Sequence, residues 1–197
     1  MQQILALFDF DGTITRKDSF LEFIKYYKGR LSFINGLIVL SPIILLHKAR
    51  IIKNWKAKEK VFAYFFKNEP FEEFSSRCRE FSLKIMPGLI KPEAIQKIYD
   101  HLGNGDRVII ISASFENWLI DWCKFMNIEL IGSRIEIKKG IITGKFNGKN
   151  CYGIEKVIRL NQYLDINQFS DIYAYGDSNS DLPLLELANH RFYKFFQ

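Results

Sequence analysis

Two carboxylates, Asp9 and Asp11, stand two positions apart at the end of an apolar run and are followed at once by Gly12 and Thr13. In an extended chain, residues i and i+2 project to the same side, so both carboxylates can converge just past a strand. Two like charges about 4 Å apart repel by roughly 4 kcal/mol at an effective dielectric near 20, which favours a cation between them. Mg²⁺, a hard ion with oxygen ligands, fits that position. The pattern indicates a phosphoryl-transfer centre.

A turn or a calcium loop is the alternative explanation, because Asp and Gly are ordinary loop residues. Calcium loops continue through further oxygen ligands to a glutamate at position twelve, whereas Ile-Thr-Arg-Lys follows here. The preceding Ile-Leu-Ala-Leu-Phe is short and apolar, which is typical of a central parallel strand buried on both faces. Ligands in such sheets bind at the carboxyl ends of the strands, where these acids lie.

The elements that position the acids alternate along the chain and predict an α/β fold with a doubly wound parallel sheet. The interval between 9 and 107 is longer than one crossover helix needs. We therefore expect 18–86 to be an inserted helical cap, with 1–17 and 87–197 as the core. The expected strands are 4–9, 107–112 and 170–175; the expected helices are 89–102, 115–126 and 153–164; and 128–146 reads as a strand followed by a hairpin.

The composition suits one compact enzyme. A chain of 197 residues with 48% hydrophobic content can bury a good core in one or at most two domains. Its three cysteines, Cys78, Cys123 and Cys151, are too few and scattered for a disulfide framework or a zinc site. The sequence enters the first strand without the features of a signal peptide, so we expect a cytoplasmic protein.

Two later segments also place polar residues at strand ends. Ser112-Ala113-Ser114 follows an apolar run, and its hydroxyl and backbone amides could hold phosphate oxygens, although alone it reads as a helix N-cap. A second run ends in Gly176-Asp177-Ser178-Asn179-Ser180-Asp181. Capping explains one such loop, but it does not explain why two separate strands both end in Gly loops that contain Asp.

With these segments in place, the chain resembles the haloacid dehalogenase superfamily of phosphohydrolases, over nearly its whole length and in order. Motif one corresponds to Asp9-Phe10-Asp11-Gly12-Thr13, motif two to Ser112 and motif four to Gly176–Asp181. The resemblance implies a Rossmann-like core, with Asp9 as the nucleophile that forms an aspartyl-phosphate and Asp11 as general acid and then base.

The same resemblance implies the metal and phosphate contacts. Mg²⁺ would be held by Asp9, the backbone carbonyl of Asp11 and Asp177, with Asp181 behind them or on metal-bound water. The residues expected to contact the substrate are Gly12, Thr13, Ser112, Ala113, Asn179 and, in the cap, Asp18.

A fixed cation is also required, because three acids and a phosphate dianion outweigh one Mg²⁺. The family supplies a lysine at motif three, and Lys156 fits the C-x-G-x-x-K-V pattern of short-chain members. Phosphoserine phosphatases carry this lysine just before the Gly, where Tyr152 stands here. Lys149 is the alternative, and Lys156 could also be an ordinary solvated helix lysine.

The cap segment 31–46 is an uncharged stretch of 16 residues, shorter than the ~20 needed to span a bilayer, and Gly36 and Pro42 interrupt it. Both flanks are basic, so a re-entrant or interfacial segment that contacts anionic lipid through 31–60 is one interpretation. The buried helix of a soluble cap is the other. No nucleic-acid motif accompanies the aromatic and basic residues 55–67, so we expect no nucleic-acid partner.

The cap also carries the choice of substrate, a phosphorylated small molecule or a lipid. The chain resembles bacterial phosphatidylglycerophosphate phosphatases of the C type in its apolar cap stretch, its C-x-G-x-x-K-V motif and its Asn-His-Arg-Phe-Tyr ending. Phosphoserine phosphatases are the alternative: they place an acid for the substrate amine at Asp18, which also suits a helix N-cap, and Arg77 is a candidate for their cap arginine. A binding module without catalysis is the alternative from another class, and the intact acids argue against it. Transfer to an acceptor other than water remains open.

Overall fold

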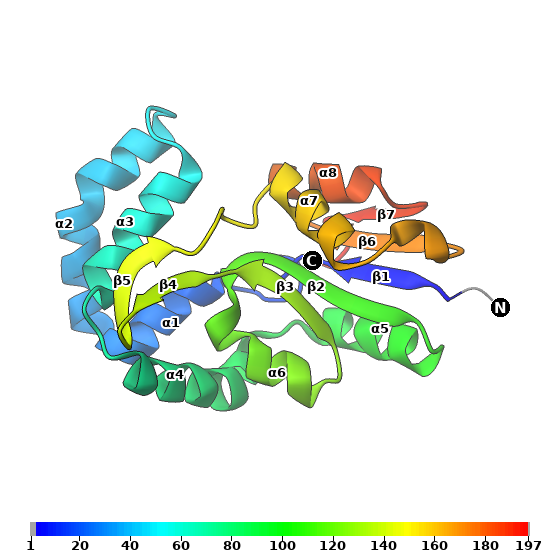
Figure 1. The fold of residues 1–197 in the computed structure, drawn as a ribbon, viewed down its shortest axis with the longest axis horizontal. Helices are drawn as coiled ribbons and strands as arrows, with labels where there is room; N and C mark the ends of the chain where they lie inside the picture. The colour runs from blue at the N-terminus through cyan, green and yellow to red at the C-terminus, as the bar shows by residue number, and fades with distance from the viewer. Residues whose placement is uncertain (1–2, 197) are drawn as a thin grey trace.

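The computed structural model describes residues 3–196, and its centre is a sheet of five strands (Figure 1). These are β1 Leu5–Phe8, β2 Arg107–Phe115, β3 Glu129–Ser133, β6 Ile172–Gly176 and β7 His190–Tyr193. They lie in the order β3-β2-β1-β6-β7, and every neighbouring pair is parallel. Because these strands are parallel, the carboxyl ends of β1 and of its neighbours β2 and β6 lie side by side at the same end of the sheet.

Helices cover both faces of the sheet (Figure 1). Ala6 and Phe8 of β1 belong to one hydrophobic cluster, whereas Leu5 and Leu7 belong to another. The first cluster includes residues of α5 Pro92–Gly103 and α6 Ile120–Phe125, and the second includes residues of α7 Ile154–Tyr163 and α8 Leu182–Glu186. Alternate side chains of β1 thus fill two cores, and the predicted doubly wound α/β fold is confirmed.

The segment between β1 and β2 is helical. It contains α1 Ser19–Lys28, α2 Arg30–Lys48, α3 Asn54–Phe66 and α4 Phe71–Glu80, then a π-helical turn Phe81–Ile85 and a 3₁₀ turn Met86–Leu89. Aromatic rings hold these helices together: the Phe23 ring lies 5.5 Å from those of Phe66 and Phe74, and 4.8 Å from that of Trp118. These helices fall inside 18–86, and the division of the chain into cap and core remains a prediction.

A β-hairpin extends the helical layer (Figure 1). Its arms, β4 Ile135–Lys138 and β5 Ile141–Phe146, pair antiparallel as predicted. It is joined to the loop between α3 and α4 and to the start of α4. The backbone N–H of Asn68 in the loop donates to the Ile142 carbonyl at 2.9 Å, and that of Phe71, the first residue of α4, donates to the Gly140 carbonyl at 2.8 Å. The hairpin therefore packs with the inserted helices, although it follows β3 in the chain.

Helix α2 is long and apolar but mostly exposed. Its mean hydropathy reaches 1.7 over an 18-residue window of which only 17% is buried, so by length and composition it could cross a membrane. Phe33, Gly36 and Leu40 are its buried residues, and a Cβ on Gly36 would lie 2.2 Å from the Phe65 ring of α3. The structure thus packs one narrow stripe of α2 on the other inserted helices and leaves most of its apolar surface facing outward.

Candidate active site

The predicted acids meet where β1 and β6 end. Asp9 directly follows β1, and its backbone N–H donates to the Tyr175 carbonyl of β6 at 2.9 Å. Gly12 lets the two strand-end loops approach: its φ is +89°, and a Cβ placed on it would lie 2.4 Å from Oδ2 of Asp177. Only glycine meets both conditions without strain. Lys91 holds this turn, because its ammonium donates a hydrogen bond to the Gly12 carbonyl at 2.5 Å.

Three aspartates form a cluster that could hold a metal ion. Asp9, Asp177 and Asp181 each offer one carboxylate oxygen, and these oxygens lie within 4.8 Å of one another. The Thr13 hydroxyl is within hydrogen-bond reach of Asp9 Oδ2 at 3.3 Å and Asp177 Oδ1 at 3.1 Å. A set of closely spaced carboxylate oxygens suits a hard divalent cation such as Mg²⁺.

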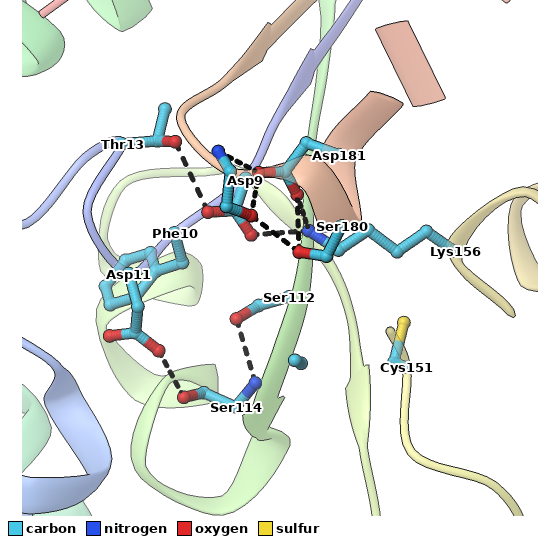
Figure 2. Close-up of polar contacts among 12 residues, drawn as sticks. Asp9, Phe10, Asp11, Thr13, Ser112, Ser114, Cys151, Lys156, Ser180 and Asp181 are labelled. Carbon is cyan, nitrogen blue, oxygen red and sulfur yellow. Dashed lines mark hydrogen bonds and ion pairs between the residues drawn. The ribbon is translucent and has the colours of Figure 1, made fainter. Parts of the chain in front are cut away.

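Lys156 is completely buried beside this cluster (Figure 2). Its ammonium donates to Asp9 Oδ1 at 2.5 Å and to Asp181 Oδ1 at 2.6 Å. Burial opposes its charge, but the two carboxylates outweigh burial and raise the pKa of Lys156 above its usual value. Lys149, in contrast, is largely exposed and lies 3.8 Å from Glu155. The geometry therefore favours Lys156 over Lys149 as the fixed cation.

Asp181 uses its oxygens within the protein. Oδ1 accepts from Lys156, while Oδ2 accepts from the Ser178 hydroxyl at 2.8 Å, the Ser178 backbone N–H at 3.0 Å and that of Asp177 at 3.3 Å. Burial raises its pKa, but Lys156 and these hydrogen bonds outweigh burial, and the net shift is downward. Asp181 is thus placed to hold both the lysine and the loop that carries Asp177.

Burial has the opposite net effect on Asp9. It raises the pKa of Asp9 to about 7, against the lowering effect of Lys156, and the charges of Asp181 and Asp11 raise it further. A cation within the cluster would favour the ionised carboxylate, which is the form required of a nucleophile.

The carboxylate of Asp11 turns away from Asp9, toward the start of α1 and the end of β2 (Figure 2). It accepts from the Ser19 backbone N–H at 2.6 Å and from the Ser114 hydroxyl. Burial raises the pKa of Asp11, as does the charge of Asp18, although the hydrogen bonds from Ser114 and Ser19 oppose this. A carboxyl with a raised pKa retains its proton more readily, as a general acid must.

The partners of Asp11 were not expected from the sequence. The Ser19 hydroxyl lies 3.1 Å from that of Ser114 and accepts from the indole N–H of Trp118 at 3.1 Å. The Ser114 backbone N–H donates to the Ser112 hydroxyl at 3.0 Å. The available signal was the Ser-Ala-Ser spacing, because Ser112 and Ser114 are two positions apart in β2. Ser19 carried no comparable signal, since it is brought here by the packing of α1 against the end of β2.

A cavity of about 550 Å³ connects this site with the inserted helices. Its polar side is formed by Asp9, Asp11, Ser112, Ala113, Ser178 and Ser180. The inserted helices contribute mainly apolar side chains: Phe20 and Leu21 of α1, Leu37 and Ile44 of α2, and Ala57 and Val61 of α3. The polar residues His47, Asn54 and Lys58 of α2 and α3 also line this side. A substrate whose phosphate lies at Asp9 would therefore meet apolar side chains beyond it.

The remaining candidates differ in their relation to this cavity. Asp18 lines it and also caps α1 by accepting from the Leu21 N–H at 3.0 Å. Asn179 is exposed in a 3₁₀ turn and is not among the lining residues, so its contact with substrate stays a prediction. Arg77 is not among them either: it lies 3.4 Å from Glu80 and over the Tyr26 ring.

Comparison with known proteins agrees with this geometry. A family model described as haloacid dehalogenase-like hydrolase matches residues 6–186. Protein CicA of Caulobacter vibrioides is 31% identical over 203 residues, which cover 100% of this chain and 88% of CicA. Histidinol-phosphatase of Neisseria meningitidis serogroup C is 26% identical over 208 residues, covering 94% of this chain and 87% of that protein. The structure of a substrate-bound phosphoserine phosphatase complex superposes with a TM-score of 0.70 at 17% identity, covering 98% and 86% of the two chains.

The chain belongs to the haloacid dehalogenase-like hydrolase family, because the family model covers most of it and matches the segments that form the site. Within this family it is a phosphatase. The family resemblance expected from the sequence is thereby confirmed.

Proposed function

We propose that the chain is a Mg²⁺-dependent phosphomonoesterase that works through an aspartyl-phosphate on Asp9. The observation that supports this most strongly is the environment of Asp9. One of its oxygens is held by the buried ammonium of Lys156, and the side chain lines the cavity beside Ser112. A carboxylate held in this way has a fixed direction of attack.

In the first step, a carboxylate oxygen of Asp9 forms a bond to phosphorus while the bond between phosphorus and the ester oxygen breaks. Asp11 gives its proton to the departing oxygen, so the alcohol leaves neutral. In the second step, Asp11 takes a proton from a water molecule that attacks the aspartyl-phosphate, and inorganic phosphate is released. Lys156 offsets negative charge on the phosphoryl group in both steps.

Asp9 and Asp177 are the side chains that would hold Mg²⁺, with the Asp11 carbonyl as a third oxygen. Bound there, the ion would neutralise charge on the phosphoryl oxygens. Asp181 has the positioning role in this proposal, because Lys156 and the 177–178 backbone already occupy its oxygens. Thr13 orients the two ligands through the hydroxyl that lies between them.

Substitution of the nucleophile tests the reaction itself. We expect Asp9→Asn to abolish Mg²⁺-dependent hydrolysis of an aryl phosphate while circular dichroism shows an intact fold. Asp171→Asn, on a partly exposed aspartate just before the opposite end of β6, is the matched control. Activity of Asp9→Asn at the wild-type level would exclude this nucleophile.

We further propose a lipid phosphate, such as phosphatidylglycerophosphate, as the substrate. The arrangement of α2 supports this. Leu37 and Ile44, seven residues apart, line the cavity that contains Asp9. Leu31, Ile38 and Leu45, also seven apart, form the next stripe at 100° per residue, and they are 79%, 66% and 64% exposed. An acyl chain that occupied the cavity would therefore emerge from it next to this exposed apolar stripe of α2.

The charges that flank α2 suit a protein bound peripherally at the cytoplasmic face of an anionic membrane. Exposed basic residues follow the helix, and each could contribute roughly 1 kcal/mol near such a surface. They are Lys48, Arg50, Lys53, Lys56 and Lys60. The alternative is a soluble metabolite: relatives include a histidinol-phosphatase, and phosphoserine phosphatases share the fold.

Direct comparison of substrates separates these proposals. We expect higher kcat/KM for phosphatidylglycerophosphate in anionic liposomes than for phosphoserine or histidinol phosphate. Faster hydrolysis of either soluble ester would reject the lipid proposal and leave the reaction through Asp9 untouched.

A further inference from the structure

Lys58 reaches from the inserted helix α3 to the end of β2, beside the proposed reaction centre. Its ammonium donates to the Ala113 carbonyl at 2.9 Å, next in sequence to Ser112. The same ammonium lies 5.4 Å from the centre of the Phe20 ring and 5.2 Å from that of Phe115. Lys58 lines the cavity that contains Asp9. It is therefore a cationic group at the boundary between the polar and apolar sides of that cavity.

The charge of Lys58 has no ion-pair partner in the part of the chain that the structure describes. No carboxylate oxygen there lies within 4.0 Å of its Nζ, in contrast with Lys156, which contacts two carboxylates. An ammonium has three donors, and Ala113 takes one. Burial lowers the pKa of Lys58, while the more distant charges of Asp18, Asp11 and Asp9 act in the opposite direction. Lys58 is partly exposed where it lines the cavity, so its remaining donors can meet an anion that enters there. Hydrogen bonds from a charged donor to a charged acceptor are the strong ones.

The direction of the leaving group places substrate near this ammonium. Asp11 would protonate the departing oxygen, and its carboxylate faces Ser19 at the start of α1 and Ser114 at the end of β2. The alcohol must therefore extend from Asp11 toward the inserted helices. The transferred phosphoryl group lies on the other side, with Asp9 and Lys156.

We propose that Lys58 binds a second anionic group, carried on the alcohol portion of the substrate. This rests on the proposed phosphomonoesterase reaction and narrows its substrate class. The group is a phosphodiester, as in the headgroup of a phospholipid, or a carboxylate, as in a phosphorylated hydroxy or amino acid. An alcohol whose only charge is a cationic amine would meet the ammonium of Lys58 without compensation.

The test compares substrates with and without the second anion. Lys58→Met and Lys58→Arg are assayed on an aryl phosphate, phosphoserine and phosphatidylglycerophosphate in mixed micelles. Lys67→Met is the matched control, because Lys67 is an exposed lysine immediately after α3. Thermal unfolding of each variant reports whether it is folded.

We expect Lys58→Met to lower kcat/KM for an anion-bearing substrate about 10- to 100-fold more than for the aryl phosphate, mainly through KM. This is the loss typical of one charge-assisted hydrogen bond. Lys58→Arg should keep most of the wild-type kcat/KM for the anion-bearing substrate, and Lys67→Met should resemble wild type on every substrate. Selective loss on phosphatidylglycerophosphate identifies the phosphodiester as the group bound, and selective loss on phosphoserine identifies the carboxylate.

Equal losses on all three substrates would overturn the proposal, because Lys58 would then act on the transferred group or only on the packing of α3. Wild-type kinetics in Lys58→Met would also overturn it. If the wild-type enzyme fails to hydrolyse the aryl phosphate with Mg²⁺, the proposed reaction itself fails, which is a different result from loss of selectivity.

Discussion

Asp9 and Asp11 are two positions apart in the chain, but their neighbours give them different properties. Asp9 is paired with a buried lysine, whereas Asp11 accepts from a backbone N–H and a serine hydroxyl. The i, i+2 argument placed both at the strand end correctly. It did not anticipate that their carboxylates diverge, because β1 ends at Phe8 and the chain turns at Gly12 before the two side chains could align.

At the same scale, Lys156 links two buried carboxylates. We expect Lys156→Met to lower kcat/KM for an aryl phosphate by at least about 100-fold, since the group that offsets phosphoryl charge is gone. Unfolding in urea should show a loss of about 3–5 kcal/mol, because Asp9 and Asp181 are left without their cation. Lys149→Met is the matched control and should change neither. Comparable effects of the two substitutions would contradict the assignment of Lys156.

The proton role of Asp11 depends on the leaving group. We expect Asp11→Asn to lower kcat/KM for an alkyl phosphate, which reports the phosphoryl-transfer step without the later hydrolysis, by about 10²–10⁴-fold, the range typical of general acid catalysis. The loss should be smaller for 4-nitrophenyl phosphate, because a nitrophenolate leaves without protonation. Steady-state rates on both esters measure this difference. An identical loss on the two would show that Asp11 does not protonate the leaving oxygen.

Among the elements, those with long apolar patterns could be predicted and the short ones could not. The runs that became β1, β2 and β6 are apolar and near-continuous. The edge strand β7, His-Arg-Phe-Tyr, has only four residues and none of them is buried. Such a strand needs no apolar run, so the sequence gives no signal for it. Helix α8 has five residues, too few to show helical periodicity. Both depend on tertiary packing more than on local pattern.

Helix α2 provides the test of membrane contact. We expect the triple substitution Leu31→Ser, Ile38→Ser and Leu45→Ser to weaken binding to anionic vesicles, because each side chain is exposed and apolar. Vesicle sedimentation measures binding, and Phe125→Ser, which removes an exposed phenylalanine from α6, is the control.

Tryptophan fluorescence gives a second measurement of membrane contact by the inserted helices. Trp55, at the start of α3, is 41% exposed, whereas Trp118 and Trp122 are buried, so quenching by brominated lipid should report mainly Trp55. Wild-type quenching and sedimentation in the triple variant would refute membrane contact through α2.

At the scale of the whole molecule, the site joins segments from the two ends of the chain. Asp9 and Thr13 meet Asp177, while Ser19 and Lys58 of the inserted helices meet β2. Sequence motifs identified the first group because it lies at strand ends. They did not identify Lys58, because a lysine in a basic, helical segment is ordinarily solvated. Only the packing of α3 against the core shows where its ammonium lies.

Metal binding at this junction should stabilise the entire fold. A ligand that binds only the folded state at 100 times its Kd adds about 2.7 kcal/mol. We therefore expect Mg²⁺ to raise the melting temperature of the wild-type protein, as measured by calorimetry. Asp177→Asn should lose most of this increase, while Asp171→Asn should retain it. The same increase in both variants would mean that Mg²⁺ binds elsewhere.

The central claim is that Asp9 carries the phosphoryl group during turnover. The most direct measurement is mass spectrometry of the enzyme quenched during hydrolysis of an aryl phosphate in the presence of Mg²⁺. We expect one added phosphoryl group on the peptide that contains Asp9, absent when the substrate is exhausted and absent from Asp9→Asn. Steady turnover with no covalent phosphate on that peptide, together with an active Asp9→Asn variant, would contradict the account.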